Sequence, residues 1–68
     1  MSFILTFDIP RQNQSLEKRI NRELRKIDAR MLQFSVWRSE NLEDLVKIAL
    51  AIRRFGGSAS ILEEKFIF

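Results

Sequence analysis

The chain of 68 residues contains no cysteine and no histidine. Without cysteine it has no disulfide bond to stabilise it, and without either residue type a zinc site of the usual kind and a histidine general base are excluded. The length predicts one domain, residues 1–68, whose core gives only a small margin over chain entropy. Association is the remaining source of stability, so we expect a homodimer.

Long apolar runs are missing as well. No segment approaches the roughly 20 consecutive apolar residues that span a bilayer. The chain passes from Met1-Ser2 directly into an apparent strand, without the basic and apolar segments of a secretory signal. Together with the lack of cysteine, this predicts a cytoplasmic protein with no membrane partner. Because 46% of the residues are hydrophobic, we expect a soluble globular domain and not a disordered chain.

Proline and glycine are scarce, and they follow the ends of predicted elements. Residues 3–7 alternate in the manner of a strand, and Pro10 follows them. A first helix is predicted from about Asn13, its candidate N-cap, to Asp28, with apolar residues at helical spacing. A second helix is predicted from about Asn41 to the pair Gly56-Gly57. Its apolar arc is wider than contact with one sheet requires, so part of it should meet a second partner.

Two further segments have strand character. Residues 31–38 alternate as one strand or a bent pair, with Leu32, Phe34 and Val36 on one side and Gln33, Ser35 and Trp37 on the other. Residues 58–68 form either one bulged strand or two short strands around Glu63-Glu64. Strands that alternate with amphipathic helices predict an α+β, ferredoxin-like fold, in which two helices cover one face of a small antiparallel sheet. The bare face is then predicted to present Ile4, Thr6, Asp8, Gln33, Ser35 and Trp37, and such a face usually binds something.

Asp8 is the first candidate functional residue, because it ends the apolar strand and precedes Ile9-Pro10. An acidic residue at the exit of a strand needs a partner or hydration. Asp-X-Pro sequences commonly begin turns, in which the Asp side chain accepts hydrogen bonds from nearby backbone N–H groups. Asp8 is therefore either a turn-forming residue or part of a site.

The first predicted helix has an almost purely basic outer side. The formal net charge of +3 is modest, but five cations lie together there: Lys18, Arg19, Arg22, Arg25 and Lys26. Like charges on one helix face repel each other, and a polyanion would neutralise them. The pattern favours contact with a nucleic-acid backbone, although charged helix faces are often only solvated surface.

The same residues resemble a known family. An apolar strand that ends in aromatic-Asp-Ile, a basic helix, and then Gln33-X-Ser35-Val36-Trp37 are similar to the CRISPR-associated protein 2 family, the small subunit of spacer acquisition. The resemblance runs to about Trp37. The chain differs from the family pattern in the spacing of Arg30 from Gln33, in Trp37 where Phe is usual, and in ending before a further strand that typical members exchange between protomers.

The resemblance implies a ferredoxin-like homodimer that binds duplex DNA or RNA and meets the CRISPR integrase. It implies that Asp8 is the metal-binding and catalytic aspartate, with Mg²⁺ as the possible cofactor. Arg30 would join the nucleic-acid contacts. The residues themselves make Gln33, Ser35 and Trp37 the candidate interface residues, with alternatives: Gln33 and Ser35 either form hydrogen bonds across an interface or face water, and Trp37 serves either in packing or in a dimer contact.

Three functions remain open. The first is a dimeric nucleic-acid-binding protein with a mainly architectural role. The second is a metal-dependent endonuclease that uses Asp8 from two protomers. A Mg²⁺ site generally takes one or two carboxylates, each chain offers one good candidate in Asp8, and a two-fold dimer would bring two copies of it together. The third is a protein dimerisation module that shares only the fold.

Overall fold

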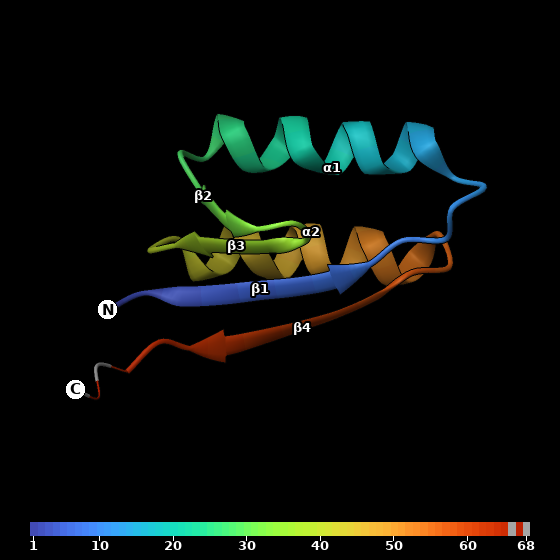
Figure 1. Ribbon diagram of the computed structural model, residues 1–68. Coiled ribbons are helices and arrows are strands. Elements are labelled where there is room, and N and C mark those ends of the chain that lie inside the picture. Colours follow the sequence, from blue (N-terminus) through green and yellow to red (C-terminus); the bar gives the residue numbers. More distant parts are fainter. Residues whose placement is uncertain (66, 68) are drawn as a thin grey trace.

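The computed structural model describes residues 1–65 and 67. Within this part of the chain the elements follow in the order strand, helix, strand, strand, helix, strand, which is the order of a ferredoxin-like fold (Figure 1). The elements are β1 (Phe3–Asp8), α1 (Gln14–Lys26), β2 (Arg30–Gln33), β3 (Val36–Ser39), α2 (Leu42–Arg54) and β4 (Ser58–Glu63).

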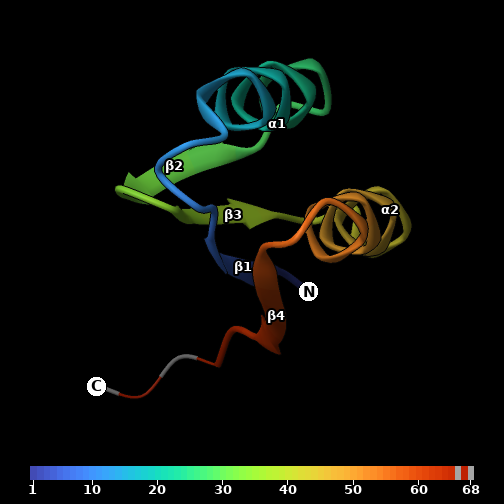
Figure 2. The same cartoon turned by 90° about the vertical axis from the view of Figure 1, so that its right-hand side faces the viewer.

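The strands form one antiparallel sheet in the order β2-β3-β1-β4. Both helices lie on the same face of this sheet, and the other face is bare (Figure 2). The ferredoxin-like α+β fold predicted from the alternating pattern is therefore confirmed. Because β1 and β4 run antiparallel, the end of β1 at Asp8 lies beside the start of β4 at Ser58.

The two helices begin and end as their sequences predict. Asn13 and Asn41 are the N-caps, and their side-chain Oδ1 atoms accept hydrogen bonds from the N–H groups of Leu16 and Asp44 at 3.3 and 3.2 Å. Each helix ends with a residue at positive φ, Asp28 at 58° and Gly56 at 95°. Both ends have the paired backbone hydrogen bonds of a Schellman motif.

The core lies between the helices and the sheet. Side chains of β1 and β3 meet those of the two helices there, and five of them are almost fully enclosed: Leu5, Ile20, Leu24, Leu45 and Ile52. The apolar stripe predicted for the first helix is buried at Leu16, Ile20 and Leu24, and Ile27 packs against its edge.

Residues 30–39 form a hairpin, which agrees with the bent pair and not with a single strand. Phe34 and Ser35 make the two-residue loop, with Ser35 at a φ of 63°. The register also shifts between Met31 and Gln33, so one face assignment cannot run through the whole segment.

This hairpin overturns part of the predicted face assignment. Trp37 pairs with Leu5 on the helix-covered side and is 3% exposed, so its placement on the bare face was wrong. Leu32 and Phe34, predicted to face the other way from Trp37, are exposed instead. Gln33 is on the bare face, because it pairs with Val36, which in turn pairs with Thr6.

The last segment leaves the sheet at Glu63. The N–H of Glu64 donates to the carbonyl of Ser2 at 2.9 Å, which ties this point to the start of β1. Whether the predicted strand character continues as a second strand depends on positions 66 and 68, which lie outside the described residues.

The wide apolar arc of α2 is only partly covered. Leu42, Val46 and Leu50, spaced four residues apart, are 40%, 41% and 60% exposed, and we call them the α2 stripe. Neither helix among the described residues has the length and apolar character needed to cross a bilayer.

Candidate functional site

Asp8 is exposed at the end of β1, on the same side of the sheet as Thr6 and opposite the buried Phe7. Alternation along the strand therefore directs its side chain away from the helices, toward the bare face. Its cross-strand partner is Ser58, and Thr6 pairs with Ser60 in the same way.

The carboxylate of Asp8 has no hydrogen bond and no ion pair with any residue that the structure describes. A turn-forming Asp accepts hydrogen bonds from backbone N–H groups that follow it. The turn after β1 is closed instead by the backbone, where the N–H of Asn13 donates to the carbonyl of Pro10 at 2.9 Å. The turn interpretation therefore lacks the hydrogen bond that defines it.

Gly57 allows the chain to return close to Asp8. A Cβ atom added at Gly57 would lie 2.7 Å from the Asp8 carbonyl oxygen and 2.7 Å from Cγ2 of Ile52. Both distances are too short for a side chain, so glycine is required where α2 leads into β4. The second glycine of the predicted Gly56-Gly57 helix stop thus also positions the candidate site.

A shallow depression surrounds Asp8, and its other polar side chains come from α2, β1 and β4. They are Arg53, Thr6, Ser58 and Ser60. Arg53 is exposed in the last turn of α2 and has no ion-pair partner among the described residues. The depression therefore combines one free carboxylate, one free guanidinium and three hydroxyl groups.

The sequence analysis missed Arg53 and the two serines. A signal was available, because in a ferredoxin-like sheet the end of the first strand meets the start of the last. That topology places the residues on either side of Gly56-Gly57 next to Asp8.

A single protomer does not assemble a metal site from carboxylates at Asp8. No group of three or more His, Cys, Asp or Glu side chains suited to a metal occurs among the described residues. A Mg²⁺ ion takes one or two carboxylates and fills its other positions with water and substrate phosphate. Asp8 is the one carboxylate among the side chains that line this depression, and a two-fold dimer would bring a second copy of it.

The basic surface of α1 is continuous and exposed. All five predicted cations, Lys18, Arg19, Arg22, Arg25 and Lys26, are on the solvent side of the helix. Within the described part of the chain one of them has an ion pair, Lys26 with Glu23 at 3.5 Å, and both side chains are largely exposed. Such a pair is worth little, so the surface keeps most of its positive charge.

The bare face of the sheet has two opposed arginines. Arg30 of β2 pairs in register with Arg38 of β3, and like charges directly opposite each other are unfavourable. Glu64 offsets one of them, because its Oε1 accepts a hydrogen bond from Nε of Arg38 at 2.7 Å. The hydrogen bonds from the hydroxyl of Ser2 and from Arg38 lower the pKa of Glu64. Arg30 is exposed and has no ion pair among the described residues.

The three predicted interface residues do not share one surface. Gln33 is exposed on the bare face, while Ser35 is half-buried in the hairpin loop, where its carbonyl accepts a hydrogen bond from the N–H of Phe7 at 3.1 Å. Trp37 lies in the core, and its Nε1 is buried without a partner among the described residues. Gln33 and Ser35 are accessible to a partner, so their interface role stays a prediction. The side chain of Trp37 is buried within the protomer and is not accessible to a partner.

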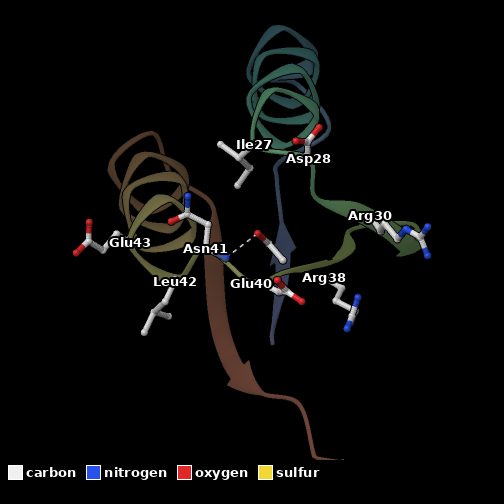
Figure 3. A pocket seen from close by; sticks show the side chains of 9 residues that line it. Ile27, Asp28, Arg30, Arg38, Glu40, Asn41, Leu42 and Glu43 are labelled. Carbon is white, nitrogen blue, oxygen red and sulfur yellow. Dashed lines mark hydrogen bonds between the residues drawn. The ribbon is translucent and has the colours of Figure 1, made fainter. Parts of the chain in front are cut away.

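A second depression lies at the opposite end of the sheet, where β3 leads into α2 (Figure 3). Arg30 and Arg38 line it, but so do the acidic residues Asp28, Glu40 and Glu43. The N–H of Asn41 donates to Oγ of Ser39 at 3.0 Å within it. Acidic side chains oppose an anion, so the basic surface of α1 is the better place for phosphate groups.

Comparison of the chain with protein-family models finds no matching family, and comparison with curated proteins finds no relative.

Proposed function

We propose that this chain is a small nucleic-acid-binding protein that acts as a homodimer and has a mainly architectural role. The observation that supports it best is the exposed cationic surface of α1, with one weak ion pair found among its described residues. Like charges four residues apart each cost a few tenths of a kcal/mol. A phosphate backbone removes that repulsion and releases its own counterions on binding.

The resemblance to the CRISPR-associated protein 2 family extends this proposal. In that role the protein acts in the cytoplasm, binds duplex DNA or RNA, and meets the CRISPR integrase. Two features support it: the ferredoxin-like fold, and the position of Asp8 at the end of β1 on the bare side of the sheet.

The bare face is the proposed contact between protomers. Neither helix covers it, and it presents Ile4, Val36 and Leu62 beside Thr6 and Gln33. Leu62 is 57% exposed. A domain of this size gains stability when a second copy covers such apolar surface.

Binding to duplexes at several salt concentrations tests the nucleic-acid proposal. Each neutralised phosphate contributes about 0.9 to the slope of log K against log salt. The double variant Arg22→Gln, Arg25→Gln should therefore bind more weakly and flatten the slope by about 1.8 for each protomer that contacts the duplex. Its matched control is Lys47→Gln, Lys65→Gln, which removes two positive charges outside α1 and should leave the slope nearly unchanged.

Equal slopes for the two double variants would contradict a specific role of α1. A parent protein that dimerises but binds no duplex would instead support the protein dimerisation module. Sedimentation of the parent protein, run alongside, measures whether the dimer forms.

A metal-dependent endonuclease is the second candidate, and the free carboxylate of Asp8 favours it. Because Asp8 is on the bare side of the sheet, a two-fold contact through that face can bring two copies of it together. Each copy would supply one ligand to Mg²⁺, which activates water and neutralises the phosphate when bound.

The variant Asp8→Asn tests the endonuclease. It removes a charged ligand and keeps the size of the side chain, so Mg²⁺-dependent cleavage of DNA or RNA should be lost while duplex binding and dimer formation remain. Asp28→Asn, an exposed acid outside the Asp8 depression, is the control and should cleave like the parent. A parent protein that binds duplexes without cleaving them would contradict the endonuclease and support the architectural role.

A further inference from the structure

A small pocket opens where α1 begins and α2 ends. Figure 1 shows that these two helix ends lie at the same end of the molecule as the end of β1. Its lining residues are Asn13, Ser15, Leu16, Arg19 and Phe55. The pocket measures about 240 Å³. That is below the ~300 to 1,000 Å³ of sites that enclose a drug-sized ligand, so it suits one flat ring system.

Phe55 forms the apolar wall of the pocket, and its side chain is 49% exposed. Phe55 is the C-cap of α2 and lines the pocket together with Leu16. Half of the residue nevertheless remains in water. An exposed aromatic ring of this kind offers a flat surface on which a nucleobase can stack.

Each helix contributes one arginine near the ring of Phe55. Arg54 lies over the ring of Phe55, with its Cζ atom 6.0 Å from the ring centroid, and is not one of the pocket-lining residues, whereas Arg19 lines the pocket from α1. Neither arginine has an ion pair among the described residues. Proteins that bind unpaired nucleotides commonly combine aromatic rings with cationic side chains. The bases stack on the rings, and the cations contact the phosphate backbone.

Asn13 and Ser15 add polar groups at the rim. Oδ1 of Asn13 accepts hydrogen bonds from the N–H of Leu16 at 3.3 Å and from the hydroxyl of Ser15 at 3.4 Å. These bonds fix the orientation of the side-chain amide, whose Nδ2 donates no hydrogen bond within the described residues. The pocket therefore has a free amide donor available for a base edge.

We propose that this pocket binds one unpaired nucleotide at the end of a nucleic-acid duplex, with its base stacked on Phe55 and its phosphate near Arg19 and Arg54. The proposal rests on the proposed nucleic-acid function, because Arg19 also belongs to the basic surface of α1. A duplex held along α1 would place its terminal nucleotide at the start of that helix. Stacking does not depend on the sugar, so the pocket should accept DNA and RNA ends alike.

The test compares a blunt duplex with the same duplex bearing one unpaired nucleotide at its end, in DNA and RNA versions. The parent protein should bind the overhang duplex at least about fivefold more tightly, as expected for one stacked base. A fluorescent base analogue, 2-aminopurine, at the unpaired position should be quenched on binding. Phe55→Leu keeps an apolar cover and should lose both the affinity gain and the quenching, whereas Phe55→Trp should retain them.

The controls separate this proposal from the proposed function. Phe55→Leu should bind the blunt duplex as the parent does, and the double variant Arg22→Gln, Arg25→Gln should weaken binding to both duplexes by the same factor. Equal affinity of the parent for the two duplexes, without quenching, overturns the pocket and leaves the proposed function intact. A parent that binds neither duplex overturns both. Circular dichroism of each variant verifies that the fold is retained.

Discussion

The two helices contain 13 residues each and cover the same face of the sheet, yet their outer surfaces differ completely. The outward side of α1 is a row of cations, and its apolar residues are all directed toward the core. The outward side of α2 includes the apolar α2 stripe, with Lys47 exposed in the middle of the helix and further charges near its ends. The helices bury three and four side chains respectively, so two elements that both build the core have a cationic outer surface on α1 and a partly apolar one on α2.

The largest effect tests whether the helices contribute equally to the core. Leu24 of α1 and Leu45 of α2 are both 0% exposed. Replacing either by Ala should lower the free energy of unfolding by about 3 kcal/mol, a large part of the stability of so small a domain. Urea denaturation measures the loss, and Leu50→Ala on the exposed stripe should change it by less than about 0.5 kcal/mol. A much smaller loss in the free energy of unfolding for Leu24→Ala than for Leu45→Ala would show that α1 is more loosely packed against the core than α2.

A second difference lies just beyond α2, where Gly57 approaches Asp8. Gly57→Ala places a methyl group against the Asp8 carbonyl and Ile52, so it should cost about 1 to 3 kcal/mol. The backbone amide signals of Asp8 and its neighbours should shift in NMR spectra. Ala29→Gly, three residues after the end of α1 as Gly57 is after the end of α2, is the comparison and should leave those signals in place. Unperturbed stability in Gly57→Ala would show that the two helix ends are interchangeable.

The residues at positive φ just after each helix provide a further comparison, in which substitutions should change the free energy of unfolding by about 1 kcal/mol. Asp28 adopts a φ of 58° after α1, where α2 has Gly56 at 95°. Asp28→Gly should therefore stabilise the protein by up to about 1 kcal/mol, and Gly56→Ala should destabilise it by about as much. Thermal unfolding of both variants measures the two shifts. Shifts of the same sign would show that the ends differ in more than backbone strain.

The smallest effect on folding is expected at the α2 stripe. The double variant Val46→Lys, Leu50→Lys exchanges exposed apolar groups for charges and should change the free energy of unfolding of the monomer by about 0.5 kcal/mol or less. Because the bare face is the proposed contact between protomers, the variant should leave self-association in sedimentation unchanged, and weaker association would place the stripe in that contact as well. Lys18→Gln, Lys47→Gln serves as a control for altered surface charge. Unchanged association would place the stripe outside the contact between protomers.

The sequence predicted the helices well, because their limits depend on local chemistry. Asn13 and Asn41 cap their own first turns, and the spacing of apolar residues identifies the buried side of each helix without reference to the rest of the chain. The position of Asp8 at the end of the first strand follows from alternation in the same local way. The ferredoxin-like fold then follows from the order of the elements.

Only the tertiary structure decided which side chains meet. Alternation in residues 31–38 predicted that Trp37 lies on the bare face. The loop at Phe34-Ser35 and the register shift near Leu32 reverse the faces, since one extra residue in a strand exchanges its two sides. Arg53, Ser58 and Asp8 are far apart in the sequence and come together because β4 pairs with β1 and Gly57 permits the close approach. Such meetings depend on strand pairing across the whole chain, which no local pattern of residues encodes.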